Sequence, residues 1–463
     1  MSTGTLEALA GAQPQAARAL EWASDKPAIS GDYERDAALH SVFWQRGLDH
    51  LATMPPKPKR SPQDQAVADH ILALSRASRS NFLATHGTVL YAQLTAQLSA
   101  YRRVEDLAYG AAASIPGLVP TQATVAAEAL LPQKDKDGHE IDQGILFNRF
   151  LGEQATGLHL CHAMLRPRPE AIEALERYKL DGLLDLGTAK VERRGKSSVV
   201  SLHNPRYLNA EDDTTVANVE TAVDLALLDP DTSICVLRGA AIKGGKYDGQ
   251  NVFCTGMNLT HLYYGKISYL WYLIRDLGFI NKMFRGLAGD VEPGEVFGST
   301  LEKPWVALVE KFAIGGGCQY LLATDYVLAA SDAYMTLPAR KEGIIPGVAN
   351  LRLPRFVGDR TARQAVMYDR RIDCDSPEGL LVCDQIVPAG DMDAALQDVI
   401  DRLTSSGVVS AASNRRAFRI AHEPLDLFRS YMAVYAREQA MCHFSPALIR
   451  NLEHHWNAQQ RAA

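Results

Sequence analysis

The sequence predicts an α/β fold whose strand-and-helix core lies between two helical regions. Three observations support this prediction. From residue 197 onward, apolar runs of strand length alternate with helical segments, which is typical of βαβ units with parallel strands. Before that point, and again after residue 387, alanine, leucine and charged residues recur at helical spacing. The length of 463 residues is sufficient for two domains with their own cores.

Each region has its own expected elements. We expect a helical N-terminal domain over residues 1–195, a core over 196–390 and a C-terminal helical region over 391–463. The N-terminal helices are expected at 64–77, 79–98, 104–113, 122–131, 144–165 and 169–178, followed by a basic linker that ends near Lys196. In the core, strands are expected at 198–202, 233–238, 305–309 and 326–330, and helices at 216–228 and 318–323. The C-terminal helices are expected at 391–403 and within 415–456.

Composition excludes several classes of function. An apolar fraction of 47%, a charged fraction of 22% and a net charge of −6 are typical of a soluble protein with no nucleic-acid surface. The basic clusters at 57–60 and 193–196 are short and are interpreted as exposed linkers. Seven cysteines without paired spacing predict reduced thiols and a cytoplasmic location. No export signal and no 18-residue apolar span is recognised, so we expect no membrane contact.

The sequence also predicts no metal site and no dinucleotide cofactor. His159 and His162 could place two ligands on one helix face, but no second pair follows at a suitable spacing. We therefore interpret this pair as part of a packed helix face. A Gly-x-Gly-x-x-Gly turn is not found either.

Three consecutive glycines mark the most informative stretch. Gly315, Gly316 and Gly317 lie between the expected strand 305–309 and the expected helix 318–323. Glycine lets the backbone approach a ligand closely, and N–H groups at a helix start have no intrahelical acceptor. Such donors suit an oxygen that gains negative charge during a reaction. A tight turn with no further role is the alternative.

A second glycine turn has the same character. Gly256 follows the expected strand 233–238 and precedes Asn258, a residue type that caps helices. Two such turns could direct two backbone N–H groups at one carbonyl oxygen.

These stretches carry a resemblance to a known family. Residues 253–258 (Phe-Cys-Thr-Gly-Met-Asn) and 314–319 (Ile-Gly-Gly-Gly-Cys-Gln) are similar to the paired signature of the crotonase superfamily, which acts on acyl-CoA thioesters. The similarity continues at 202–210, 337–338, 343–347 and 376–382. It implies a crotonase-like spiral of ββα units. It also implies that the oxyanion hole is formed by the N–H groups of Met257 and Gly316.

Two departures from the family pattern limit the chemistry. Crotonase-type hydratases use two carboxylates as general acid and base, at positions that hold Gln319 and Ala339 in this chain. An amide cannot exchange a proton near neutral pH, and alanine has none to exchange. We therefore expect the site to stabilise a thioester enolate but not to add water to a double bond.

The whole chain, including its helical N-terminal part, resembles the superfamily's cofactor-independent dioxygenases, which act on arylacetyl-CoA thioesters in glycopeptide-antibiotic biosynthesis. The resemblance implies that the substrates are an acyl-CoA and O2, that no cofactor is used, and that the chain forms a homotrimer or a dimer of trimers. Two alternatives stay open: another crotonase-fold hydrolase or isomerase, and an acyl-CoA-binding subunit without catalysis.

The resemblance also assigns residues to the substrate. Glu211, Arg275 and Gln319 would contact its polar groups, although Glu211 could be a surface carboxylate and Arg275 a structural ion-pair partner. Lys243 or Lys246 would meet the CoA phosphates unless they belong to an ordinary surface loop. The remaining expected contacts are Cys254, Thr255, Asn258, Leu259, Gly315 and Gly317. For the proton acceptor, His203 and Glu211 are the candidates.

Overall fold

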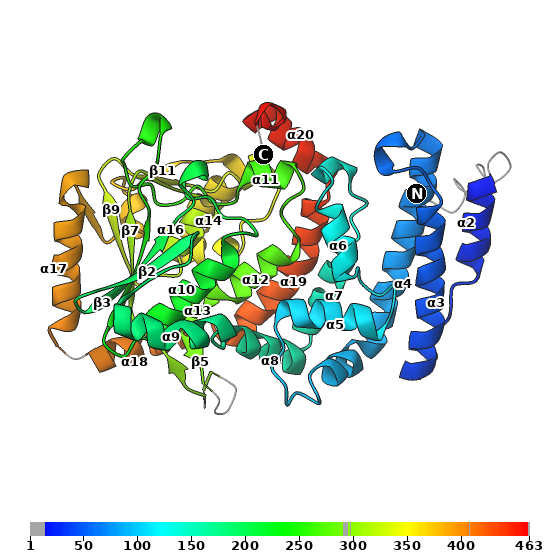
Figure 1. Ribbon diagram of the computed structural model, residues 1–463, viewed down its shortest axis with the longest axis horizontal. Helices are drawn as coiled ribbons and strands as arrows, with labels where there is room; N and C mark the ends of the chain where they lie inside the picture. Colours follow the sequence, from blue (N-terminus) through cyan, green and yellow to red (C-terminus); the bar gives the residue numbers. More distant parts are fainter. Residues whose placement is uncertain (1–13, 290–294, 297, 407, 462–463) are drawn as a thin grey trace.

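In the computed structural model, the described residues are 14–289, 295–296, 298–406 and 408–461. Helices make up the N-terminal part, and the first of them lie on the right in Figure 1. These helices are α2 (Pro14–Ser24), α3 (Tyr33–Ala52), α4 (Pro62–Leu94), α5 (Val104–Ser114), α6 (Gln122–Glu128), α7 (Ile141–Gly152), α8 (Gln154–Leu165) and α9 (Pro169–Asp181). In the part of the chain that is described, no helix combines the length and apolar character needed to cross a bilayer.

Several expected helix boundaries in this part are wrong, including the ends expected at 98 and 131, which lie at Leu94 and Glu128. The helices expected at 64–77 and 79–98 form one helix, α4, because the residues at the expected break are buried and bonded. Ser78 Oγ accepts a hydrogen bond from Trp44, and Arg79 pairs with Asp142 at 2.9 Å. The helix expected at 144–165 is divided into α7 and α8, because Glu153 adopts extended backbone angles. The helices α2 and α3 were not expected.

The core is built on a seven-stranded sheet in the order β1-β2-β3-β4-β7-β9-β12. Its strands are β1 (Leu183–Asp185), β2 (Ala189–Arg194), β3 (Ser197–Leu202), β4 (Ile234–Gly239), β7 (Trp305–Val309), β9 (Tyr326–Ala330) and β12 (Gln385–Val387). From β3 to β12 neighbouring strands are parallel. Every residue of β4 and β7 is buried, as expected for central parallel strands covered on both faces.

The stretch 193–196 is exposed over residues 194–196, as expected, but it is not a linker between domains. It belongs to β2 and to the turn into β3, and these two strands pair in antiparallel register. Arg193 donates from Nε and Nη2 to the carboxylate of Asp229, both at 2.8 Å. The sheet therefore starts with β1 and β2, before the expected domain boundary at residue 196.

A narrow second layer follows the carboxyl ends of the central strands. It contains β8 (Phe312–Ile314), β10 (Tyr334–Thr336) and β11 (Ile372–Asp373). Isolated parallel bridges join Glu211 to Met257 and Cys254 to Ala313. Segments that follow β3, β4, β7 and β9 are thereby placed side by side, which is what brings the two glycine turns together. Outside these layers, β5 (Leu287–Ala288) pairs with β6 (Thr300–Leu301).

Helices from the C-terminal region connect the core to the N-terminal part. In Figure 1, α19 runs between the N-terminal helices and the core sheet. Gly144 of α7 packs so closely on this helix that an added Cβ would lie 2.5 Å from Ala440 Cβ. Tyr269 Oη donates to the carbonyl oxygen of Ala436 at 2.6 Å.

The core helices are α10 (Val216–Leu228), α11 (Leu259–Tyr263), α12 (Leu270–Leu277), α13 (Phe279–Arg285), α14 (Gly316–Leu321), α15 (Ala339–Glu342) and α16 (Ala349–Tyr368). The C-terminal helices are α17 (Met392–Thr404), α18 (Val408–His422), α19 (Leu425–His443) and α20 (Pro446–Trp456).

Candidate active site

The two glycine turns are in direct contact. Gly256 has a φ of +73°, in the region that favours glycine. A Cβ added to it would lie 2.6 Å from the carbonyl oxygen of Ile314 and 2.7 Å from the nitrogen of Gly316. A side chain at Gly256 would therefore push the turns apart. The structure brings together the two segments that the sequence analysis paired.

Backbone pairing determines which way Met257 points. Glu211 N donates to Gly256 O, and Asn258 N donates to Glu211 O, both at 2.8 Å. Because residues alternate along an extended strand, the N–H of Met257 is directed away from Glu211. Among the hydrogen bonds of the described residues, neither this N–H nor that of Gly316 has an acceptor.

Both residues line one small cavity, together with Gly315, Gln319 and helix residues of α12, α15 and α19. Its volume is about 30 Å³, enough for one or two water molecules. Binding of an acyl chain here therefore requires the surrounding side chains to move apart. That the two amides polarise a thioester carbonyl remains a prediction.

Each glycine of the triplet meets a different constraint. Gly315 has a φ of +53°, which L side chains rarely adopt. A Cβ on Gly316 would lie 2.1 Å from Glu211 Oε2, and one on Gly317 would lie 2.5 Å from the carbonyl oxygen of Cys254. Contacts this short do not occur in a packed protein. The triplet is thus required by the packing of the turn itself.

Arg275 is the centre of a buried network behind the Gly316 turn. Its Nε and Nη2 donate to the two carboxylate oxygens of Glu211 at 2.8 and 3.0 Å. Nη1 donates to Asp276 and to Gln319 Oε1, and Nη2 donates to the carbonyl oxygen of Gly316 at 3.1 Å. These bonds use all five N–H donors of a guanidinium group. No donor of Arg275 is left for a substrate without breaking an internal bond.

Glu211 is equally constrained. Besides Arg275, the hydroxyl of Tyr320 donates to Glu211 Oε1 at 2.6 Å. All three side chains are buried. Burial opposes the charge of Arg275, but Glu211 and Asp276 raise the pKa of its guanidinium well above the usual range. The structure therefore contains the ion pair that the sequence analysis considered as an alternative, and direct substrate contact by Glu211 and Arg275 remains a prediction.

Gln319 differs from these residues because one side of its amide is free. Its Oε1 accepts from Arg275, whereas its Nε2 forms no hydrogen bond with any residue that the structure describes. Since Gln319 lines the cavity, two N–H donors are available to a bound ligand.

Two carboxylates that line the cavity, Asp276 and Glu342, were not expected from the sequence. Glu342 lies one helical turn after Ala339, at the end of α15, and both residues line the cavity. Burial, with a smaller contribution from Asp369, raises the pKa of the Glu342 carboxyl to about 7. Residues three apart share a helix face, and this spacing is the signal that could have identified it.

A tyrosine also lines the cavity, and it contacts a histidine that does not line it. Tyr272 lines the cavity, and its hydroxyl lies 3.7 Å from Met257 Sδ and 3.1 Å from His443 Nδ1. Burial lowers the pKa of His443 to about 3, so its imidazole is neutral. His203, a candidate proton acceptor in the sequence analysis, does not line this cavity.

Residues expected to meet CoA lie along the first turn and the loop before it. Lys243 and Lys246 are exposed. Thr255 donates from its hydroxyl to the carbonyl oxygens of Tyr207 and Leu208. Asn258 caps α11, which starts at Leu259, and it also donates to Asp212 at 3.0 Å. Cys254 is buried, and its sulfur accepts from the N–H of Gly256. Their contacts with CoA remain predictions.

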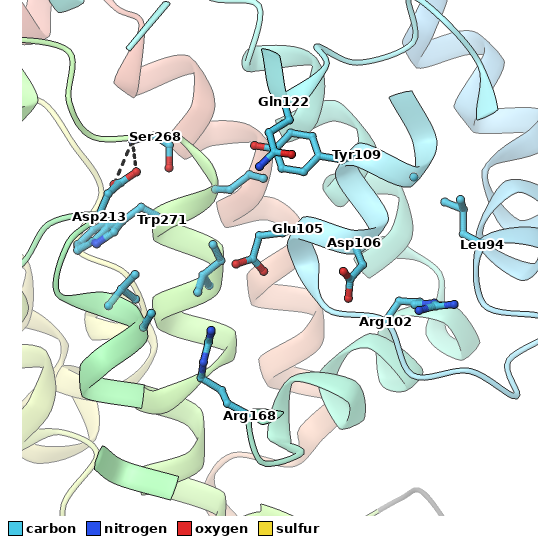
Figure 2. Close-up of a pocket in the computed structure, with 15 residues that line it drawn as sticks. Leu94, Arg102, Glu105, Asp106, Tyr109, Gln122, Arg168, Asp213, Ser268 and Trp271 are labelled. Carbon is cyan, nitrogen blue, oxygen red and sulfur yellow. Dashed lines mark hydrogen bonds between the residues drawn. The ribbon is translucent and has the colours of Figure 1, made fainter. Parts of the chain in front are cut away.

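A larger cavity lies on the other side of α12. Figure 2 shows it between α5, which carries Glu105 and Asp106, and the core segment with Asp213 and Ser268. Its volume is about 820 Å³. Trp271 lines both cavities. In the described part of the chain, no group of three or more His, Cys, Asp or Glu side chains could hold a metal ion.

Comparison with known proteins identifies the class. The family model described as enoyl-CoA hydratase/isomerase matches residues 294–439. Together with a relative that aligns over nearly its whole length, this match shows that the chain belongs to the enoyl-CoA hydratase/isomerase (crotonase) superfamily. That relative is the (3,5-dihydroxyphenyl)acetyl-CoA 1,2-dioxygenase of Amycolatopsis orientalis. It is 42% identical over 419 residues, which cover 90% of this chain and 95% of the relative.

More distant relatives match only part of this chain. A short-chain-enoyl-CoA hydratase of Clostridium acetobutylicum is 25% identical over 236 residues, which cover 50% of this chain and 82% of that enzyme. The crystal structure of an enoyl-CoA hydratase from Mycobacterium avium subsp. paratuberculosis K-10 aligns with a TM-score of 0.47 and 22% identity. This alignment covers 58% of the present chain and 99% of the other.

Proposed function

We propose that this protein is a dioxygenase that converts (3,5-dihydroxyphenyl)acetyl-CoA and O2 into 3,5-dihydroxyphenylglyoxylate and free CoA, without metal or flavin. The observation that carries the proposal is the 42% identity to a dioxygenase of that specificity over 95% of its length. The contact between the two glycine turns at one cavity supports it. The absence of a carboxylate at Gln319 and Ala339 argues against a hydratase.

The reaction starts with the thioester oxygen between the N–H groups of Met257 and Gly316. Each such donor contributes on the order of 10²–10³ in rate. Loss of one α-proton gives an enolate that is conjugated with an electron-rich ring. The enolate transfers one electron to O2, and the two radicals combine at Cα to give a peroxide.

The remaining steps release CoA. The peroxide oxygen attacks the thioester carbonyl, and CoA leaves as a thiolate. The O–O bond then breaks as the second α-hydrogen leaves as a proton, which gives the α-keto acid. Both oxygen atoms of O2 are thus in the product. In this proposal the Gln319 amide donates to a polar group of the ligand, and the Glu211–Arg275 pair holds the Gly316 turn.

An oxygen electrode tests the proposal. Chelator-treated protein is mixed with (3,5-dihydroxyphenyl)acetyl-CoA, and free thiol is measured in parallel. We expect O2 uptake and CoA release in equal amounts. Thiol release under nitrogen would instead identify a thioester hydrolase, and binding without turnover would identify an acyl-CoA-binding subunit. A role in antibiotic biosynthesis, a cytoplasmic location and assembly as a homotrimer or dimer of trimers are further proposals from the family resemblance.

A further inference from the structure

Glu342 is a buried glutamate whose carboxylate is not hydrogen-bonded to the network around Arg275. The residue is 8% exposed and lines the cavity between the two turns. A Cβ added to Gly315 would lie 4.0 Å from Glu342 Oε1, so this carboxylate is close to the triple-glycine turn. No hydrogen bond to the Glu342 carboxylate is formed by the residues that the structure describes. It can therefore accept a proton without losing an internal bond.

The other acidic side chains near the cavity lack this freedom. Asp276 accepts a hydrogen bond from Arg275 at 2.7 Å, and Glu211 accepts from both Arg275 and Tyr320. A carboxylate held by a buried guanidinium is a weak base, because its partner stabilises the charged form. Among the described carboxylates that line the cavity, Glu342 alone lacks such a partner.

We propose that Glu342 is the proton acceptor that forms the thioester enolate. In this step the Cα–H bond breaks and its proton moves to an Oε of Glu342. The electron pair stays on the substrate and is delocalised onto the thioester oxygen beside the N–H groups of Met257 and Gly316. The inference rests on the proposed function only in its choice of substrate, because enolate formation does not require O2.

Two properties of the position support this role. Burial keeps the carboxyl pKa at about 7, and a general base is most effective when its pKa lies near the working pH. Ala339 occupies the position of the carboxylate that hydratases use, and Glu342 lies one turn further along the same helix. In this inference the acid–base group lies one turn further along α15 than the carboxylate of hydratases.

Solvent exchange separates proton removal from oxygenation. The full-length protein is incubated with (3,5-dihydroxyphenyl)acetyl-CoA in D2O under nitrogen, and deuterium at Cα is measured by mass spectrometry. We expect exchange by the wild type and a loss of at least about 100-fold in Glu342→Gln, because general bases contribute 10²–10⁴ in rate. Glu342→Asp, which retains a carboxylate on a shorter side chain, should exchange at an intermediate rate.

A matched control comes from a second buried glutamate. Burial also raises the pKa of Glu140 to about 7, but Glu140 does not line the cavity. Glu140→Gln should exchange at the wild-type rate. A non-reactive thioether analogue of the substrate should bind Glu342→Gln and the wild type with equal affinity, which excludes a loss of binding as the cause. If Glu342→Gln does not fold, the deuterium exchange rate of Glu342→Asp is used instead. A rate equal to that of the wild type would contradict the inference.

The outcomes distinguish this inference from the proposed function. If the wild type consumes O2 and Glu342→Gln exchanges normally, the dioxygenase function stands and Glu342 is not the acceptor. If exchange depends on Glu342 but no O2 is consumed, the acceptor is correct and the oxygenase assignment is wrong. If the wild type neither exchanges nor consumes O2, both are wrong.

Discussion

Replacement of Gly316 by alanine is the most direct test of how the site is built. The new Cβ would lie 2.1 Å from Glu211 Oε2 and 2.9 Å from Arg275 Nη2. To restore van der Waals contact, the carboxylate must withdraw by about 1 Å or the turn must move by as much. Glu211 cannot withdraw freely, because Arg275 and Tyr320 hold it at 2.6–3.0 Å.

The cost follows from these contacts. Overpacking a close-packed site costs about 1–3 kcal/mol, and a lost hydrogen bond to a charged group costs about 1.5–3 kcal/mol. We expect Gly316→Ala to lower the free energy of unfolding by about 2–4 kcal/mol. A displacement of about 1 Å at a reacting centre reduces the rate about 100-fold. Deuterium exchange and O2 uptake should therefore both fall by that factor.

The assay combines urea unfolding with the two rate measurements. Gly152→Ala is the matched control, because an added Cβ there has no neighbour within 4 Å. It should retain the wild-type urea midpoint and rates. If Gly316→Ala also retains them, Glu211 does not lie where the structure has it, and the account of the triple glycine is wrong.

Three further predictions concern the same cavity. Arg275→Lys should lower the free energy of unfolding by about 2–4 kcal/mol, because the three donors of an ammonium group cannot replace the five hydrogen bonds of the guanidinium group, although the charge is kept. A urea midpoint equal to that of the wild type would contradict this. Gln319→Glu keeps an acceptor for Arg275 but loses both amide donors, so O2 uptake should fall, and unchanged uptake would count against the role of this amide. The Glu342 carboxyl has its pKa raised from 4.5 to about 7 by burial and Asp369, while the nearby charge of Arg275 is neutralised by Glu211 and Asp276. Its favourable contribution to stability is therefore fully present below about pH 4.5 and is lost as the pH rises through 7, by about 3 kcal/mol in all. The urea midpoints at pH 5 and pH 8 should differ less in Glu342→Gln than in the wild type. The deuterium exchange rate of the wild type should rise as the pH passes 7.

Much of the core could be predicted from local sequence. The apolar runs at 305–309 and 326–330 are the strands β7 and β9, because a strand covered on both faces is apolar along its whole length. The two glycine turns were recognised from the residues around Gly256 and Gly316. Errors arose where tertiary contacts override local pattern, as at Ser78, which accepts a hydrogen bond inside α4 where a break was expected.

The roles of Glu211 and Arg275 could not be decided from local sequence. Each had a structural and a substrate-binding interpretation, and nothing in its neighbourhood along the chain favours either. Four of the five hydrogen bonds of Arg275 reach residues that are distant in sequence, namely Glu211, Gly316 and Gln319. Only the folded chain shows that its donors are all used.

The family, the parallel core and the positions of the turns are properties of short segments, and the amino-acid order alone determines them. The protonation chemistry is different. Whether a glutamate is a solvated surface group or a base with a pKa near 7 depends on what covers it. Glu342 shares its cavity with residues of α12, α19 and the triple-glycine turn, which only the tertiary structure brings together.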